Sequence, residues 1–331
     1  MTTLFAYIAV VLIWATTPLA IQWSSDSLSF MAAALLRMSL ALALALLIVA
    51  IFRRSFFAMG AHWKIYLAAS LGIFPNMPVV YWSAQFIPSA LIAVIFAFSP
   101  FVTGLMTLLL LKQNPFNVKR VLALLLALFG LVIIFYRQLQ LGPQAALGIA
   151  GILVSTFFFG LSSVLVKKIS DQSTLAVDAF SQATGALLFS LPGLLLLWLL
   201  VDGDANVQFS VKSAASIVYL ALIGSLVGFA LFFYILQRLS PSSVALVTLM
   251  TPVLAILLGW SIADEVLSLQ TLVGVSLVLL ALLLYIPWSL QSWRQAIARW
   301  WVKSLRARAL TPEEYPEVGL QDLKDDFIRY K

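Results

Sequence analysis

Long apolar runs separated by short polar stretches form the dominant pattern of this chain. A helix needs about 20 apolar residues to cross roughly 30 Å of hydrocarbon. Ten segments meet this length: about 3–22, 30–52, 63–85, 88–111, 118–136, 146–167, 175–201, 212–237, 241–262 and 268–288. Lipid offers the backbone no hydrogen-bond partners, and the segments are too uniformly apolar for the strands of a barrel. The pattern therefore predicts an all-α integral membrane protein with ten transmembrane helices.

Composition supports this class and removes several kinds of chemistry. Apolar residues make up 63% of the 331 residues and charged residues 10%, whereas soluble domains are roughly half apolar and a quarter charged. The absence of cysteine excludes disulfides, thiolate catalysis and cysteine-based metal sites. His62 is the only histidine, which excludes a histidine-rich metal site or proton relay. We therefore expect neither a metal nor a cofactor.

The distribution of Lys and Arg predicts the orientation in the membrane. If the N-terminus is cytoplasmic, seventeen of the 20 Lys and Arg residues fall in cytoplasmic segments, and Arg137 and Lys212 fall outside. We therefore expect both termini in the cytoplasm and a multi-pass protein of the cell inner membrane. The net charge of +7 then reflects topology and does not indicate a nucleic-acid partner.

The two halves of the chain align with each other in two stretches, each without gaps, and the loop near 202–210 absorbs the difference of seven residues between them. An offset of 152 residues pairs Gly72 with Gly224, Gln85 with Gln237, Ala93 with Ala245 and Pro100 with Pro252. For the first two helices of each half an offset of 145 is better, and it pairs Trp14 with Phe159 and Arg37 with Gln182. Each half has five spans, an odd number, so the second half is inverted. Inverted repeats at 1–140 and 141–288 are typical of transporters that alternate access to a site near the midplane.

Five segments carry a resemblance to a known family. They are LIWATTPLAIQ in the first span, the arginine of the second, SALIAVIFAFSP and SSVALVTLMTP at the start of the fourth and ninth, and ADEVLSLQTLVGVSLVL before the tenth. With them the chain resembles the ten-helix EamA-type members of the drug/metabolite transporter superfamily. The resemblance implies a fold of two inverted five-helix repeats. The first half departs from the pattern, because Lys112 and Gln113 stand where the family has an acidic pair.

The third span contains the sequence GIFPNMPVVYWSAQ, which breaks the apolar pattern at membrane depth. Pro75 and Pro78 remove two backbone donors, which predicts a kinked or partly unwound helix that presents carbonyls beside Asn76. Tyr81, Trp82 and Gln85 follow. We interpret this stretch as a substrate-contacting segment with a gating or structural role for the prolines and Gln85. A packing kink with interfacial aromatic residues is the alternative.

Polar and aromatic residues in the other spans complete a candidate substrate site. The predicted contacts are Trp14, Thr17, Ser99, Phe158, Ser162, Gln182, Phe229, Tyr234, Thr248 and Thr251. Core packing of small and hydroxyl-bearing residues is the alternative for these positions. Pro100 and Pro252 predict matching bends, which are either hinges or structural kinks. A cavity of this composition suits a neutral, zwitterionic or amphipathic molecule such as an amino acid, and it disfavours nucleotide sugars and sugar phosphates.

Two charged residues in or near the spans allow more than one interpretation. Arg37 lies seven residues into the second span, where it is a structural or gating anchor, a ligand for a substrate carboxylate, or a snorkelling side chain. Asp178 lies near the cytoplasmic end of the seventh span. It either caps that helix or carries protons for coupled transport.

The sequence after the tenth span predicts contact with the membrane surface. Residues 289–310 place tryptophans and leucines at helical spacing among arginines and lysines, as expected for a basic amphipathic helix on the anionic inner leaflet. Residues 311–331 form a polar tail, and a homodimer is possible. The chain has no HExxH sequence, no paired catalytic aspartates and no P-loop, so neither an intramembrane enzyme nor an ATP-driven pump is expected. Secondary export of small metabolites is the leading hypothesis. A lipid flippase or a non-transporting scaffold is the alternative.

Overall fold

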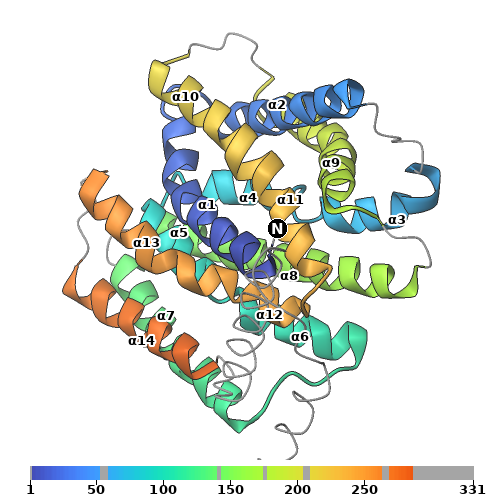
Figure 1. Ribbon diagram of the computed structural model, residues 1–331. Coiled ribbons are helices and arrows are strands. Elements are labelled where there is room, and N and C mark those ends of the chain that lie inside the picture. Colours follow the sequence, from blue (N-terminus) through green and yellow to red (C-terminus); the bar gives the residue numbers. More distant parts are fainter. Residues whose placement is uncertain are drawn as a thin grey trace, which may run out of the picture. The chain divides into compact units, whose positions relative to one another are not determined.

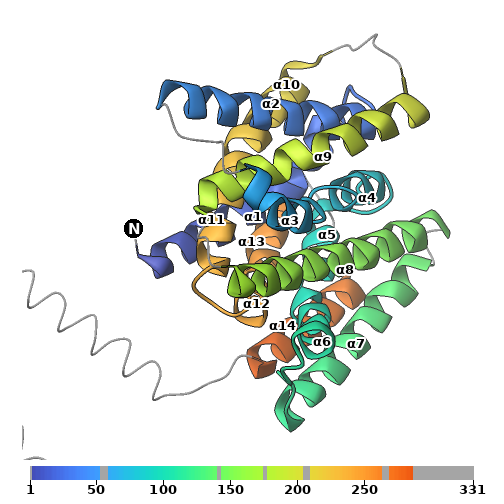
Figure 2. The same ribbon diagram turned by 90° about the vertical axis from the view of Figure 1, so that its right-hand side faces the viewer.

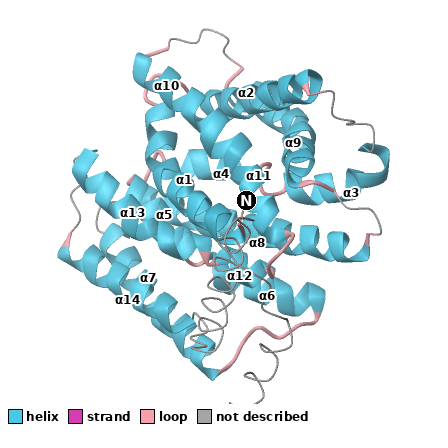
Figure 3. Ribbon diagram, in the orientation of Figure 1, coloured by secondary structure: helices cyan, strands magenta, loops and turns pink. Residues whose placement is uncertain are grey.

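The computed structural model describes residues 2–52, 59–139, 143–173, 177–203, 209–262 and 268–285. Within these ranges the regular structure is helical throughout, as Figure 3 shows. The predicted amphipathic helix at 289–310 and the tail at 311–331 lie outside the described residues. Residues 1–286 form one unit by their contacts, and the fold described below belongs to that unit.

Fifteen helical elements follow one another along the described residues. They are α1 (Thr3–Ser24), α2 (Phe30–Ile51), α3 (Met59–Ser70), α4 (Asn76–Ser83), α5 (Ser89–Phe96), α6 (Ser99–Leu111), α7 (Val118–Leu139), α8 (Pro143–Gln172), α9 (Ala179–Val201), α10 (Val211–Tyr219), the π-helix η1 (Leu220–Val227), α11 (Gly228–Leu236), α12 (Pro241–Ala245), α13 (Val247–Ile262) and α14 (Leu269–Tyr285).

Seven helical segments of the described chain are long and apolar enough to cross a membrane. They are Thr3–Ser24, Phe30–Ile51, Ser89–Leu111, Gln144–Gln172, Ala179–Val201, Val211–Leu236 and Pro241–Ile262. The prediction of an all-helical membrane protein is therefore confirmed. The other three predicted spans fall on α3 with α4, on α7 and on α14, so the count of ten stays a prediction.

Small polar residues fix where several of these helices begin. The hydroxyl oxygen of Ser29 accepts a hydrogen bond from the Ala32 amide, and Ser210 and Ser240 cap α10 and α12 in the same way. Each cap satisfies one of the amides that the first turn of a helix leaves without a partner. Polar residues between the apolar runs thus end one helix and start the next.

The interruption predicted in the third span is present. Helix α3 ends at Ser70, α4 begins at Asn76, and residues 71–75 between them form turns (Figure 1). The peptide bond between Phe74 and Pro75 is cis. Two half-helices therefore take the place of one continuous span.

Side chains from neighbouring helices bind the carbonyls around this interruption. The Ser162 hydroxyl donates to the Ala68 carbonyl at 2.8 Å, and the Ser190 hydroxyl donates to the Ser70 carbonyl at 3.3 Å. The Asn76 side-chain amide donates to the Gly72 carbonyl at 2.9 Å. These carbonyls are therefore engaged inside the bundle, whereas the sequence predicted that the break would present free carbonyls at membrane depth.

We expect Asn76→Leu to lower the free energy of unfolding by about 1–3 kcal/mol, because it removes two buried hydrogen bonds. Asn76 is fully buried, and its carbonyl oxygen also accepts a hydrogen bond from the Ser155 hydroxyl. The measurement is thermal unfolding in detergent. In Asn76→Leu the Ser155 hydroxyl loses its acceptor. The double variant Asn76→Leu/Ser155→Ala removes this hydroxyl, so it should be more stable than Asn76→Leu alone. Equal stability of Asn76→Leu and the wild type would contradict a structural role for this amide.

Helices of the two halves cross one another in matching pairs. Helix α6 packs along α8, and α13 packs along α1; α5 meets α13, and α2 meets α9 (Figures 1 and 2). Helix α7 lies beside α14, and a Cβ atom added at Gly130 would lie 2.7 Å from the Gly274 carbonyl oxygen. Only glycine at position 130 allows these two backbones to approach so closely.

Candidate functional site

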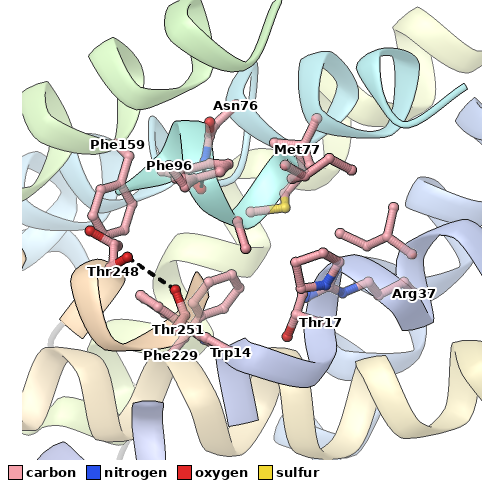
Figure 4. A pocket seen from close by; sticks show the side chains of 16 residues that line it. Trp14, Thr17, Arg37, Asn76, Met77, Phe96, Phe159, Phe229, Thr248 and Thr251 are labelled. Carbon is pink, nitrogen blue, oxygen red and sulfur yellow. Dashed lines mark hydrogen bonds between the residues drawn. The ribbon is translucent and has the colours of Figure 1, made fainter. Parts of the chain in front are cut away.

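A cavity of about 80 Å³ lies where helices of both halves meet (Figure 4). Its lining residues are Trp14, Thr17, Pro18, Ile21, Arg37, Gly72, Asn76, Met77, Val80, Ile92, Ala93, Phe96, Phe159, Phe229, Thr248 and Thr251. Small-molecule sites usually measure roughly 300–1,000 Å³. This conformation is therefore too narrow for a metabolite, and binding requires the lining helices or side chains to move apart. We call this space the central cavity.

Seven residues predicted from the sequence line the central cavity. They are Trp14, Thr17, Arg37, Asn76, Phe229, Thr248 and Thr251. They come from α1, α2, α4, α11 and α13, so the structure brings together side chains that are up to 237 residues apart in the chain.

Hydroxyl groups in the cavity wall donate to backbone carbonyls three or four residues earlier in the chain. Thr17 bonds the Ile13 carbonyl at 3.0 Å, Thr248 bonds the Ala245 carbonyl at 2.7 Å, and Thr251 bonds the Thr248 carbonyl at 3.1 Å (the last two residues appear in Figure 4). Because each hydroxyl hydrogen is used in this way, the oxygens keep acceptor capacity toward the cavity. The wall can thus accept hydrogen bonds from a ligand N–H group.

Four aromatic rings from four helices pack against one another at one side of the central cavity. The Phe159 ring on α8 lies 5.7 Å from Trp14 on α1, 6.4 Å from Phe96 on α5 and 5.3 Å from Phe232 on α11, measured between ring centroids. Trp14 and Phe232 also contact each other, at 5.1 Å. We call these four residues the aromatic layer.

A second, smaller void borders the aromatic layer. It measures about 10 Å³, and its wall includes Phe159, Phe232, Ser162 and Ser163. Phe159 lines both spaces, as do Gly72 and Phe229. Ser162 and Ser163 follow Phe159 on α8 and line only the smaller void, so the aromatic layer is a candidate barrier toward the C-terminal end of this helix.

Arg37 extends from α2 into the interior of the bundle. Its side chain is 1% exposed, and its Nε atom donates to the Ser225 hydroxyl at 2.8 Å. Ser225 belongs to the π-helix η1, a distortion often found at functional sites. Because the side chain is buried and bonded to another helix, it does not snorkel toward the membrane surface in this structure.

Gln182, the residue that the repeat pairs with Arg37, takes part in a different link. It is fully buried, and its Oε1 accepts a hydrogen bond from Gln237 Nε2 at 3.1 Å. Gln237 also donates to the Val177 carbonyl at 2.9 Å. These contacts tie α9 to α11 away from the central cavity. Gln85, the counterpart of Gln237, is exposed, and its side chain donates to the Trp82 carbonyl.

The remaining predicted contacts lie outside the lining of the central cavity. They are Tyr81, Trp82, Ser99, Phe158, Ser162, Gln182 and Tyr234. The ring of Trp82 packs on Phe86 at 5.1 Å, and the guanidinium of Arg238 lies 3.5 Å from the centre of the Tyr234 ring. Phe158 contacts the exposed Phe157, and the neighbouring Phe159 faces the cavity instead.

The predicted bends at Pro100 and Pro252 differ in the structure. The interruption between α5 and α6 falls at residues 97–98, and only Ser99 separates it from Pro100. The interruption between α12 and α13 falls at Leu246, and Pro252 lies inside α13. Thus both spans are broken, but only one break is close to its proline. Pro75 and Pro78 flank the start of α4, as described above.

Asp178 caps the start of α9. Its Oδ1 atom accepts hydrogen bonds from the amides of Phe180 and Ser181, each at 3.1 Å, and its Oδ2 atom accepts one from the Ser181 hydroxyl at 2.5 Å. The position is exposed and does not line the central cavity. These contacts support the capping interpretation of this carboxylate.

We expect Asp178→Asn to retain the stability of the wild type and the pH dependence of its transport, because Asn caps helices about as well as Asp. Asp178→Ala should lower the free energy of unfolding by about 1 kcal/mol. Thermal unfolding and transport between pH 5 and 8 check both statements. If Asp178→Asn abolished the pH dependence and kept substrate exchange, the carboxylate would carry protons.

The comparison with known proteins assigns the chain to a family. The model of the EamA-like transporter family matches residues 1–136 and residues 146–286. The chain belongs to the EamA-like transporter family. The two matched ranges cover most of the described helices, and they leave out the sequence after residue 286.

Relatives of this EamA-like chain include proteins that are named as a transporter and as an efflux pump. Protein PecM of Dickeya dadantii is 26% identical over 72% of this chain and 78% of its own length. The uncharacterized transporter YoaV of Bacillus subtilis is 23% identical over 82% and 92%. A probable amino-acid metabolite efflux pump of Escherichia coli is 26% identical over 54% and 60%.

The fold also occurs in a protein of known crystal structure. That chain superposes with a TM-score of 0.65 over 86% of this chain and 96% of its own length, at 15% sequence identity. At this identity the likeness concerns the fold alone. It places the helices of the EamA-like chain in an arrangement already seen in a crystal.

Proposed function

We propose that this EamA-like protein is a secondary transporter that exports small neutral, zwitterionic or amphipathic metabolites, such as amino acids. Membership of a transporter family is established by the match over both halves. The observation that carries the proposal is the central cavity, whose wall combines aromatic rings, hydroxyl oxygens and one charged residue, Arg37. Among the relatives, the probable amino-acid metabolite efflux pump of Escherichia coli agrees with this substrate class.

The mechanism that we propose is alternating access between two inverted five-helix repeats. The matching helix pairs support it, because α6 on α8 and α13 on α1 are related by the exchange of the two halves. The central cavity receives side chains from both halves, so rocking of one half against the other changes its shape. The aromatic layer closes one route to it. The proposal includes cytoplasmic termini, an inner-membrane location and contact of residues 289–310 with the anionic inner leaflet.

A transport screen in proteoliposomes tests this function. The full-length protein is reconstituted, and efflux of labelled amino acids, amines and nucleosides is measured with the proton gradient fixed and then reversed. We expect efflux of at least one small zwitterionic or neutral compound without ATP. Absence of transport across the panel, together with scrambling of labelled lipid, would replace the proposal by a flippase function.

A further inference from the structure

Arg37 is a buried cation whose hydrogen-bonding capacity is only partly used. Its Nε atom is held by Ser225, whereas its Nη1 atom is buried and has no hydrogen-bond partner among the described residues. No carboxylate of the described chain lies within ion-pair distance of it. An isolated charge in an apolar environment is costly unless a group of opposite charge joins it.

The guanidinium borders the central cavity. In Figure 4 the Arg37 side chain reaches toward Thr17, and both residues belong to the lining. A Cβ atom added at Gly224 would lie 3.4 Å from Arg37 Nη2 and 3.8 Å from Thr17 Oγ1. The absence of a side chain at Gly224 thus leaves room beside the charged group. Arg37 is also the only charged residue among the lining residues.

The predicted repeat provides an internal comparison for this arginine. Gln182, its counterpart, is neutral and does not line the central cavity; its Oε1 accepts a hydrogen bond from Gln237, and its buried Nε2 has no partner among the described residues. A link between two helices at this level can therefore be made by an uncharged side chain. Linking two helices therefore does not require a positive charge, so the charge at position 37 serves another function.

We infer that the substrate carries one carboxylate and that Arg37 binds it through Nη1. The planar guanidinium matches a carboxylate in geometry and forms charge-assisted hydrogen bonds with it. A single cation balances one negative charge, which favours a monocarboxylate over a phosphate ester. The bond from Nε to Ser225 fixes the plane of the guanidinium before the substrate arrives. This inference rests on the proposed transport function and names the chemical group that the site recognises.

Matched pairs of ligands test the inference by binding rather than by transport. The probes are phenylalanine, leucine and threonine, each compared with its own carboxamide, and binding to the purified full-length protein is measured by calorimetry. We expect at least one acid to bind about 10- to 100-fold more tightly than its amide, the range typical of a hydrogen bond to a charged group. In Arg37→Gln the acid and the amide should bind equally.

Further variants separate recognition from folding. Ser225→Ala keeps the charge and removes its anchor, so it should weaken acid binding less than Arg37→Gln does. Arg238→Gln is the matched control, because it removes the same charge at an exposed position outside the central cavity, and it should leave binding unchanged. Thermal unfolding without ligand shows whether each variant is folded.

Three results would overturn the inference. The wild type could bind acids and amides equally, which would mean that water satisfies the guanidinium. Arg37→Gln could weaken acid and amide binding by the same factor, which would make Arg37 a structural anchor. The third such result would be that none of the three acids shows measurable binding. In each case the transport screen still decides the proposed function separately, because it includes compounds without a carboxylate.

Discussion

Ala93→Leu is expected to lower transport by about 10- to 100-fold without loss of stability. Ala93 is 2% exposed and lines the central cavity from α5. Leucine adds three heavy atoms to a space of about 80 Å³ that already has to expand for a substrate. A ligand would have to enter a site that the leucine side chain already fills, and such overpacking costs about 1–3 kcal/mol of binding free energy. Each 1.4 kcal/mol is a tenfold change in affinity.

The stability of this variant separates two explanations of lost transport. Filling an apolar cavity often stabilises a protein, so the melting temperature of Ala93→Leu should equal or exceed that of the wild type. Ala43→Leu is the matched control, because Ala43 is exposed on α2, away from the central cavity. Its transport should be normal. Normal transport by Ala93→Leu would mean that the substrate does not pass through the central cavity.

The sequence predicted the features that depend on local chemistry. Pro75 and Pro78 cannot both continue a helix, and the structure interrupts the third span directly before Asn76. The spans predicted from about residues 30 and 212 likewise begin within one residue of α2 and α10. Each of these features follows from a few neighbouring residues, so no knowledge of packing is needed.

The orientation of each helix about its own axis could not be predicted in the same way. A helix that is apolar all round has no polar face that points to solvent, so its sequence does not say which side meets the cavity. Phe157, Phe158 and Phe159 are consecutive and chemically identical, yet only Phe159 lines the cavity. The pairing of Trp14 with Phe159 in the repeat was the one indication of the correct residue, since both face the same space.

The sequence also could not predict which side chains from distant segments form hydrogen bonds with each other. Ser225, which lies on the π-helix η1, accepts a hydrogen bond from Arg37, and no residue pattern in LALIGSLV indicates this contact. Gln182 was predicted to contact substrate, but Gln237 from α11 engages it elsewhere. Such pairings depend on how helices cross, which the apolar pattern alone does not determine.

Phe159→Ala is expected to open the aromatic layer and to raise the accessibility of the void behind it at least about tenfold. Phe159 makes three of the ring contacts in the layer, to Trp14, Phe96 and Phe232. Aromatic pairs contribute about 0.5–1.5 kcal/mol each beyond their buried area, so losing three of them shifts the balance toward an open form. The chain has no cysteine, so one introduced thiol reports on this change without background.

The reporter is Ser163→Cys, which lies in the wall of the void beyond the layer. Labelling by a membrane-impermeant maleimide is measured in right-side-out vesicles, in which the reagent has to cross the aromatic layer to reach Ser163→Cys, with and without Phe159→Ala. Phe157→Ala is the matched control, because Phe157 is 41% exposed on the same helix and lies outside the layer, and it should leave the labelling rate unchanged. Equal labelling in all three backgrounds would show that the four rings form no barrier. Faster labelling only with Phe159→Ala would locate the gate between the two halves at this ring, because Phe159 touches α1, α5 and α11 at once.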